Sequence, residues 1–156
     1  MQFCSFNTDD VEGELAHAVE EGLMSQIEAD AVDKEKIKAF LSGELAARVN
    51  IAANVYREKC FTCAFKAGEV YPELRGEEAE ETVIVDGTAD LAFEENGKLV
   101  VVDYKTDSRV TDDILRERYS GQLAVYAKCL SELLNIEVKE TLIYSFSLGK
   151  TVEIAQ

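Results

Sequence analysis

Asp90, Asp103 and Lys105 are residue types that together can hydrolyse a phosphodiester bond when they share one face. Two carboxylates held a few ångströms apart repel each other unless a hard cation lies between them, and Mg²⁺ or Mn²⁺ suits such oxygen ligands. The metal activates water and neutralises phosphate charge, while the lysine stabilises charge or positions the nucleophile. The alternative is a surface strand with ordinary charges. Against it, the Leu-Val-Val-Val run at 99–102 is apolar on both faces, which is typical of a central strand with a functional end.

A β-hairpin is predicted to bring the two aspartates together. Residues 82–93 and 98–106 are rich in β-branched side chains, and the intervening Asn96-Gly97 suits the positive φ angles of a type I′ turn. In a hairpin closed by that turn, the numbers of paired residues sum to 193, so Asp90 faces Asp103. Facing residues have Cβ atoms about 4.5–5.5 Å apart. The alternation of side chains along a strand then places Lys105 on the face of Asp103.

The other elements follow from apolar spacing and capping residues. Helices are predicted from a cap at Asn7 or Thr8 to about Ala29, and from Asp33 with an interruption near Gly43. A long helix begins at about Thr111. The predicted strands cover residues 55–65, 140–147 and 151–154, and residues 67–81 are predicted as a loop or strand edge. This order predicts one α/β domain with a mixed central sheet, the hairpin inside it and helices on both sides.

Three motifs together resemble the RecB-like branch of the PD-(D/E)XK nucleases. They are Gly87-Thr88-Ala89-Asp90, then Val102-Asp103-Tyr104-Lys105-Thr106-Asp107, then Gln122-Leu123-Ala124-Val125-Tyr126. Within that branch the likeness is to the C-terminal nuclease domain of AddA-type helicase–nucleases. Looser similarity includes Gly13-Glu14-Leu15-Ala16-His17 and Tyr56-Arg57-Glu58, so the resemblance covers most of residues 12–147. It implies a restriction-endonuclease-like α/β core.

The resemblance also implies a role for each matching residue. The implied metal ligands are two carboxylates, a histidine and a main-chain carbonyl: Asp90, Asp103, His17 and Tyr104. The implied catalytic residues are Asp90, Asp103, Lys105, Gln122 and Tyr126, with the last two on one helix face at i and i+4. Alternatives stay open for several residues. His17, the only histidine, is also compatible with a packed or surface position, Tyr126 with plain core packing, and Glu58 with an exposed position or a hydrogen bond to the site.

The function that the resemblance implies is a Mg²⁺-dependent exonuclease acting on single-stranded DNA. Mn²⁺ is expected to substitute for Mg²⁺. The implied partners are a helicase domain in the same chain and a second, AddB-like helicase–nuclease protein, acting in double-strand break repair and recombination in the bacterial cytoplasm. On this hypothesis the 156 residues are one domain from the C-terminus of a longer chain. The alternatives are a free-standing RecB-like nuclease of a phage or defence system, and an inactive docking module with the same fold.

Two further cofactors of such proteins are not expected here. An iron–sulfur cluster in this branch uses three cysteines beyond the Gln-x-x-x-Tyr helix, whereas Cys129 alone lies downstream and sits inside that helix. Gly149-Lys150-Thr151 imitates the end of a P-loop, but position 144, which would hold the first glycine, is Tyr144. Cys60 and Cys63 have the gap of a metal knuckle, but residues three apart on a strand point to opposite faces, which favours structural thiols.

Composition limits the remaining classes. With 31 acidic and 16 basic residues the net charge is −15, which excludes a generally basic nucleic-acid binder but not a metalloenzyme. Apolar residues make up 47% of the chain, enough for a packed core. The run at 99–102 is far shorter than the ~20 residues that span a bilayer. No basic segment followed by an apolar one opens the chain, so a secretory signal is not expected.

Overall fold

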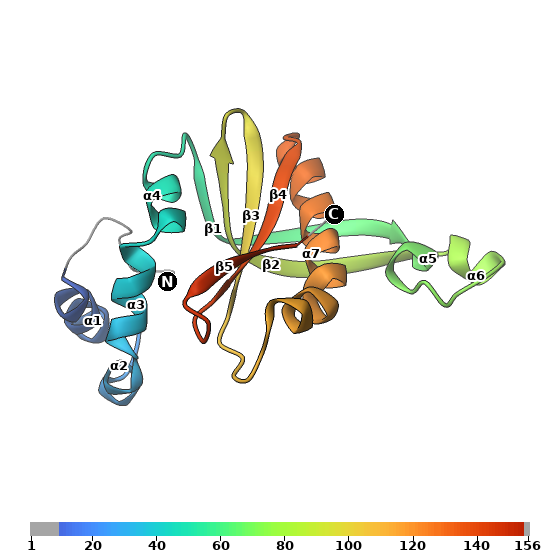
Figure 1. Ribbon diagram of the computed structural model, residues 1–156. Coiled ribbons are helices and arrows are strands. Elements are labelled where there is room, and N and C mark those ends of the chain that lie inside the picture. The colour runs from blue at the N-terminus through green and yellow to red at the C-terminus, as the bar shows by residue number, and fades with distance from the viewer. Residues whose placement is uncertain (1–9, 155–156) are drawn as a thin grey trace.

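The computed structural model describes residues 10–154 as a five-stranded mixed sheet with helices on both faces (Figure 1). The strands lie in chain order across the sheet: β1 (Val55–Lys66), β2 (Thr82–Glu95), β3 (Lys98–Lys105), β4 (Val138–Ser145) and β5 (Lys150–Ile154). Strands β3 and β4 are parallel, and the other neighbouring pairs are antiparallel. The parallel pair requires a crossover, which helix α7 (Asp112–Leu134) supplies. The predicted α/β class with a mixed sheet is confirmed.

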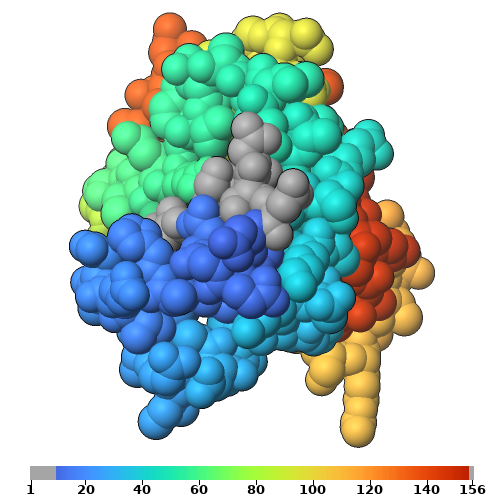
Figure 2. Space-filling view, turned by 90° about the vertical axis from the view of Figure 1, so that its left-hand side faces the viewer, coloured from blue at the N-terminus to red at the C-terminus, as the bar shows by residue number. Residues whose placement is uncertain are grey.

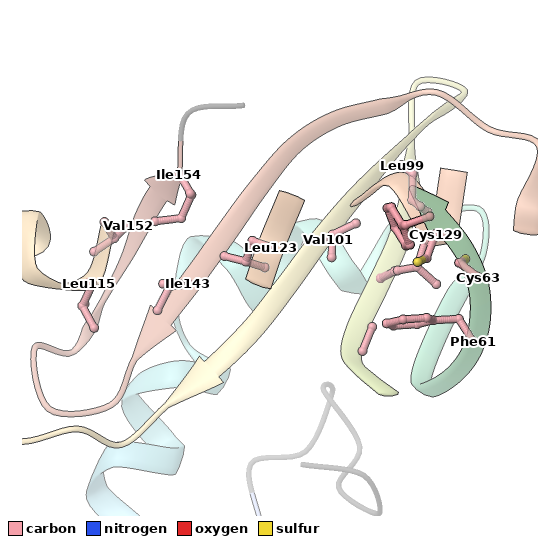
Figure 3. Close-up of a cluster of buried hydrophobic side chains, with 14 of the residues drawn as sticks. Phe61, Cys63, Leu99, Val101, Leu115, Leu123, Cys129, Ile143, Val152 and Ile154 are labelled. Carbon is pink, nitrogen blue, oxygen red and sulfur yellow. The ribbon is translucent and has the colours of Figure 1, made fainter. Parts of the chain in front are cut away.

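Two apolar layers sandwich the sheet. Helix α7 covers one face, where Val101 and Ile143 pack with Leu115 and Leu123 (Figure 3). The other face is covered by α3 (Lys34–Leu41) and α4 (Glu44–Asn50), whose side chains pack against β2, β3 and β4. Strand β3 therefore contributes to both layers, and all four residues of its Leu-Val-Val-Val run are fully buried. This explains the apolar character of both its faces.

The hairpin between β2 and β3 has the predicted register. Its pairs run from Glu95 with Lys98 to Leu91 with Val102, and their numbers sum to 193 throughout. Asn96 and Gly97 have φ angles of 54° and 75°, as a type I′ turn requires. The pairing ends at Leu91 with Val102, so the expected next pair, Asp90 with Asp103, lies just beyond the regular ladder.

Two predicted boundaries are wrong. The first helix does not continue to Ala29: α1 (Val11–Glu20) ends before Gly22, whose φ is 70°, and Ser25 then caps the separate helix α2 (Gln26–Ala31). Asp10 is the N-cap of α1, while Asn7 and Thr8 lie outside the described residues. The predicted loop after β1 instead contains two single-turn helices, α5 (Ala67–Val70) and α6 (Glu77–Glu80), at the tip of the arm that β1 and β2 form in Figure 1.

An ion cluster fastens α4 to the sheet beside the hairpin turn. The Arg48 guanidinium donates to Glu95 from Nε at 2.8 Å and from Nη2 at 3.0 Å, and it also contacts Glu140. Lys139 contacts the same Glu95 carboxylate. The hydrogen bond from Arg48, followed by that from Lys139, outweighs burial and lowers the pKa of Glu95 to about 2. Glu95 therefore connects elements from three parts of the chain.

Glu95→Gln is expected to lower the free energy of unfolding at pH 7 by about 1–2 kcal/mol, because it replaces a partly buried, charge-assisted contact. A lowered folded-state pKa stabilises the fold above the ordinary value of 4.5, and that contribution is lost as the pH falls through about 2. The difference between wild type and variant should therefore close over this window. Urea unfolding across a pH series measures it.

The matched control is Glu137→Gln. Glu137 forms a surface pair with Lys98, and 73% of its side chain is exposed, so its replacement should change stability by less than about 0.5 kcal/mol. A difference for Glu95→Gln that stayed constant down to pH 2 would contradict the prediction.

Candidate active site

Asp90 lies where the regular geometry of β2 is interrupted. Leu91 packs with the layer under α3 and α4, whereas Ala89 and Ala92 both pack with the α7 layer, so strict alternation fails at this point. Opposite Asp90 in the β1–β2 register is Glu58, whose φ of 46° is unusual for a residue with a side chain. The Asp90 carboxylate accepts a hydrogen bond from the Tyr104 main-chain N–H at 2.7 Å. A side chain thus links β2 to β3 where the ladder has ended.

Asp103 is a buried carboxylate in an acidic surrounding. It is 3% exposed, and its Oδ2 lies 2.6 Å from the Lys105 ammonium nitrogen. Burial is the largest influence on its pKa and raises it; Lys105 opposes this, while the negative charges of Asp90 and Asp107 add to it. The pKa of Asp103 therefore lies above its usual range. Additional positive charge at this point would favour the ionised form.

Lys105 connects this carboxylate to helix α7. Its ammonium donates to Gln122 Oε1 at 3.5 Å, and Gln122 Nε2 donates to the Tyr126 hydroxyl at 2.7 Å. The Tyr126 ring packs edge-on against Phe61, with ring centres 5.2 Å apart. Burial lowers the pKa of Lys105, but the hydrogen bond and charge of Asp103 outweigh it, so the pKa is raised overall. A continuous polar chain therefore runs from Asp103 through Lys105 and Gln122 to Tyr126.

Two hollows flank this polar chain. The first has a volume of about 420 Å³, and Glu58, Asp90 and Tyr104 line it together with α3 residues that include Lys36. The second, about 590 Å³ and mostly apolar, extends along α7 from Gln122 and Tyr126 toward α5. The carboxylates and the ammonium thus lie beside space that a substrate can enter.

The structure does not bring His17 to the aspartates. His17 is exposed on α1, which lies outside α3 as seen from the sheet (Figures 1 and 2). Within residues 10–154, no three His, Cys, Asp or Glu side chains form a group that could hold a metal ion. Asp90, Asp103, Lys105, Gln122 and Tyr126 do lie in one region, with Tyr104 between the aspartates.

Tyr119 and Asp107 are two residues of the site that the sequence pattern did not reveal, since it predicted Tyr119 only as an apolar position of the long helix. In the structure both surround Lys105: its ammonium lies 4.2 Å from the Tyr119 ring centre, and the Tyr119 hydroxyl donates to Asp107. The available signal was the spacing of Tyr119 and Gln122, because residues three apart share a helix face.

The cysteines behave as structural thiols among the described residues. Cys60 is exposed and Cys63 is buried, as their separation on β1 predicts, and both are free thiols, as is the buried Cys129. None of the helices in residues 10–154 combines the length and apolar character needed to cross a bilayer.

A mixed α/β sheet with two aspartates and a lysine at the end of a central hairpin is the arrangement of a PD-(D/E)XK nuclease. The comparison with protein families agrees: residues 5–150 match the family described as the PD-(D/E)XK nuclease superfamily. The chain belongs to this superfamily.

Relatives in bacteria narrow the likeness. Proteins named as ATP-dependent helicase/nuclease subunits of the AddA type are 34% identical over 157 residues in Ruminiclostridium cellulolyticum and 41% identical over 140 residues in Carboxydothermus hydrogenoformans. The protein of the same name in Acetivibrio thermocellus is 33% identical over 153 residues. These matches cover 99%, 87% and 96% of this chain but only 13%, 12% and 12% of the relatives. The resemblance to AddA-type proteins inferred from the motifs is confirmed.

Asp103→Asn is expected to raise the melting temperature at pH 7. A carboxyl whose folded-state pKa lies above its ordinary value of 3.8 contributes stability below that value, and the contribution is lost as the pH rises through the folded-state pKa. The amide removes the cost of burying this charge. Differential scanning calorimetry should show the gain at pH 7 and its disappearance near pH 3.

Asp113→Asn is the control for this comparison. The Asp113 side chain is 94% exposed, so its substitution should leave the melting temperature nearly unchanged at both pH values. A lower melting temperature for Asp103→Asn at pH 7 would mean that the ion pair with Lys105 outweighs the cost of burial.

Proposed function

We propose that this chain is a divalent-metal-dependent deoxyribonuclease domain that hydrolyses phosphodiester bonds in single-stranded DNA as an exonuclease. The observation that carries the proposal is the buried Asp103–Lys105 pair beside Asp90, continued by Gln122 and Tyr126. Membership of the PD-(D/E)XK nuclease superfamily supports it. Few structural roles require a buried carboxylate whose neighbours include two further carboxylates.

The donor set fits a hard divalent cation. Asp90, Asp103 and the main-chain carbonyl of Tyr104 would hold it, since oxygen atoms are the ligands that Mg²⁺ and Mn²⁺ prefer. The observed crowding of negative charge around Asp103 is what such an ion would relieve. When bound, it would activate water and neutralise phosphate charge. His17 stays a proposed fourth ligand on its motif alone, because it is apart from the aspartates here.

The protein groups have distinct proposed tasks. Lys105 presents a positive charge beside the aspartates, where it can stabilise the negative charge that develops on the phosphate. Gln122 accepts from that ammonium and donates to Tyr126, so it fixes the direction in which the lysine points. The packing of Tyr126 on Phe61 holds the far end of this chain against the core.

We further propose that the domain works within a larger ATP-dependent helicase–nuclease. The support is the similarity, over most of this chain, to short portions of proteins that carry that name. On this proposal a helicase in the same polypeptide feeds single-stranded DNA to the site, a second, AddB-like protein is the partner, and the setting is double-strand break repair in the bacterial cytoplasm. The length of the complete reading frame distinguishes this assembly from a free-standing nuclease.

An inactive docking module is the second candidate, and the net charge of −15 favours it. An acidic domain should bind DNA weakly by itself. Against this candidate, the aspartates, the lysine and the glutamine occupy one region and contact one another. Cleavage of DNA by the purified chain decides between the two.

Lys105→Ala is expected to lower the rate of cleavage of labelled single-stranded DNA by about 10²–10³-fold, which is typical for the loss of a group that stabilises developing charge. Asp103→Asn should remove cleavage altogether. The assay contains Mg²⁺ or Mn²⁺, and chelation by EDTA should stop the wild-type reaction. Lys98→Ala, at the far end of the hairpin, is the control and should retain wild-type activity. Unchanged cleavage by Lys105→Ala would contradict the assignment.

Binding of single-stranded DNA by the isolated chain is expected to be weak and to depend little on salt. Two of the basic residues near the motifs are already paired, Arg116 with Asp113 and Arg118 with Asp107. On single strands the salt slope is about 0.7 per phosphate contacted, so a slope shallower than about −3 is expected. Fluorescence anisotropy across a salt series measures it. Tight binding without metal would show that the affinity has another source.

A further inference from the structure

The Lys105 ammonium is held from three directions. Asp103 Oδ2 lies 2.6 Å away, Gln122 Oε1 lies 3.5 Å away, and the face of the Tyr119 ring lies beside it, 4.2 Å from ammonium nitrogen to ring centre. Only 17% of the lysine side chain is exposed. A cation beside an aromatic face is attracted by the negative face of the ring. Asp103 and Gln122 have places in the proposed reaction, whereas Tyr119 does not.

The Tyr119 ring is itself held at its far end. Its hydroxyl lies 3.0 Å from each oxygen of Asp107 and donates to that carboxylate. Arg118 contacts the same carboxylate at 3.3 Å. Burial, and then the hydrogen bond to Asp107, raise the pKa of the Tyr119 hydroxyl, so it remains a donor at neutral pH. Asp107 lies just beyond β3 and Tyr119 lies on α7, so the bond joins the two elements that carry Lys105 and Gln122.

We propose that Tyr119, anchored by Asp107, is a positioning residue that holds the Lys105 ammonium between Asp103 and Gln122 in its reactive orientation. The inference rests on the proposed function, because it presumes that Lys105 acts in cleavage. Its physical basis is the flexible four-carbon stem of lysine, which reaches many positions unless neighbouring groups restrict it. An aromatic face restricts the ammonium without neutralising it. Misplacement of a reacting group by even about 1 Å is costly to a rate.

The geometry separates this role from two others. Tyr119 is directed to Asp107 by its hydroxyl, so that hydroxyl is occupied and does not approach Asp90 or Asp103 in the described structure. Asp107 uses both oxygens on Tyr119 and one also on Arg118, which leaves it engaged away from the aspartates. Tyr119 therefore acts on Lys105 through its ring, and Asp107 acts through Tyr119.

The first test compares kcat and KM for cleavage of single-stranded DNA by the purified chain. Tyr119→Leu removes the aromatic face and should lower kcat by about tenfold with KM unchanged. Tyr119→Phe keeps the face but loses the bond to Asp107, so a smaller loss, about threefold, is expected. Tyr71→Leu, on the exposed arm, is the matched control and should keep wild-type kcat. All variants should retain wild-type circular dichroism and cooperative melting.

The second test reports on the lysine without requiring activity. A ring face beside the side chain should shift the NMR signal of the Lys105 ε-methylene upfield, with the signal assigned by its loss in Lys105→Arg. The upfield shift should persist in Tyr119→Phe and disappear in Tyr119→Leu. Absence of the shift in the wild-type chain would overturn the positioning role.

The two tests keep the proposals separate. Wild-type kcat in a folded Tyr119→Leu chain would overturn the positioning role, as would a change confined to KM, which would instead indicate a direct DNA contact. A wild-type chain that shows the NMR shift but does not cleave DNA would overturn the proposed function, while the shift would still support the contact between Tyr119 and Lys105.

Discussion

The burial of Asp103 against Lys105 is the interaction on which the rest of the site depends. A carboxylate that is almost inaccessible to water at the end of a central strand is stable only with compensating charge, and one ammonium at 2.6 Å supplies part of it. The remaining imbalance, to which Asp90 and Asp107 contribute, still keeps the pKa of Asp103 raised. A site with this excess of negative charge is suited to receive a cation, and the same excess disfavours the fold when no cation is present.

The sheet makes this burial possible by covering β3 on both faces. Helix α7 packs on one side and helices α3 and α4 on the other, so residues at the end of β3 are enclosed by elements from distant parts of the chain. The hairpin ladder ends one step before the aspartates, and the Asp90 carboxylate takes the Tyr104 N–H in place of a strand partner. The positive φ of Glu58 on the neighbouring strand marks the same irregularity. Strain of this kind, concentrated beside the reactive groups, is common at functional sites.

The acidic character of the domain is consistent with a division of tasks inside a larger enzyme. A net charge of −15 gives the domain little attraction for phosphates. A nuclease of this composition needs its substrate delivered, and the relatives that it resembles are named as helicase/nuclease proteins and are about eight times its length. Local positive charge at Lys105 and at a bound metal would then suffice for chemistry, because affinity comes from elsewhere in the assembly.

The sequence by itself determined the hairpin, its register, the α/β class, the long helix and the family motifs. These depend on local preferences: Asn96 and Gly97 adopt positive φ angles, and β-branched residues alternate along strands. It placed Asp90, Asp103 and Lys105 close together because a hairpin converts sequence distance into register. The break between α1 and α2 and the short helices after β1 escaped it, since a single glycine or cap decides such boundaries.

Only the tertiary structure decided how the site is surrounded. The end of the ladder at Leu91 and the contact of Tyr119 with Lys105 depend on how α7 packs across the sheet. The exposed position of His17 depends on where α1 lies, and no local pattern specifies that. The physical reason is that side-chain contacts between elements far apart in sequence arise from packing of whole layers, whereas spacing along the chain specifies only neighbours on one strand or helix.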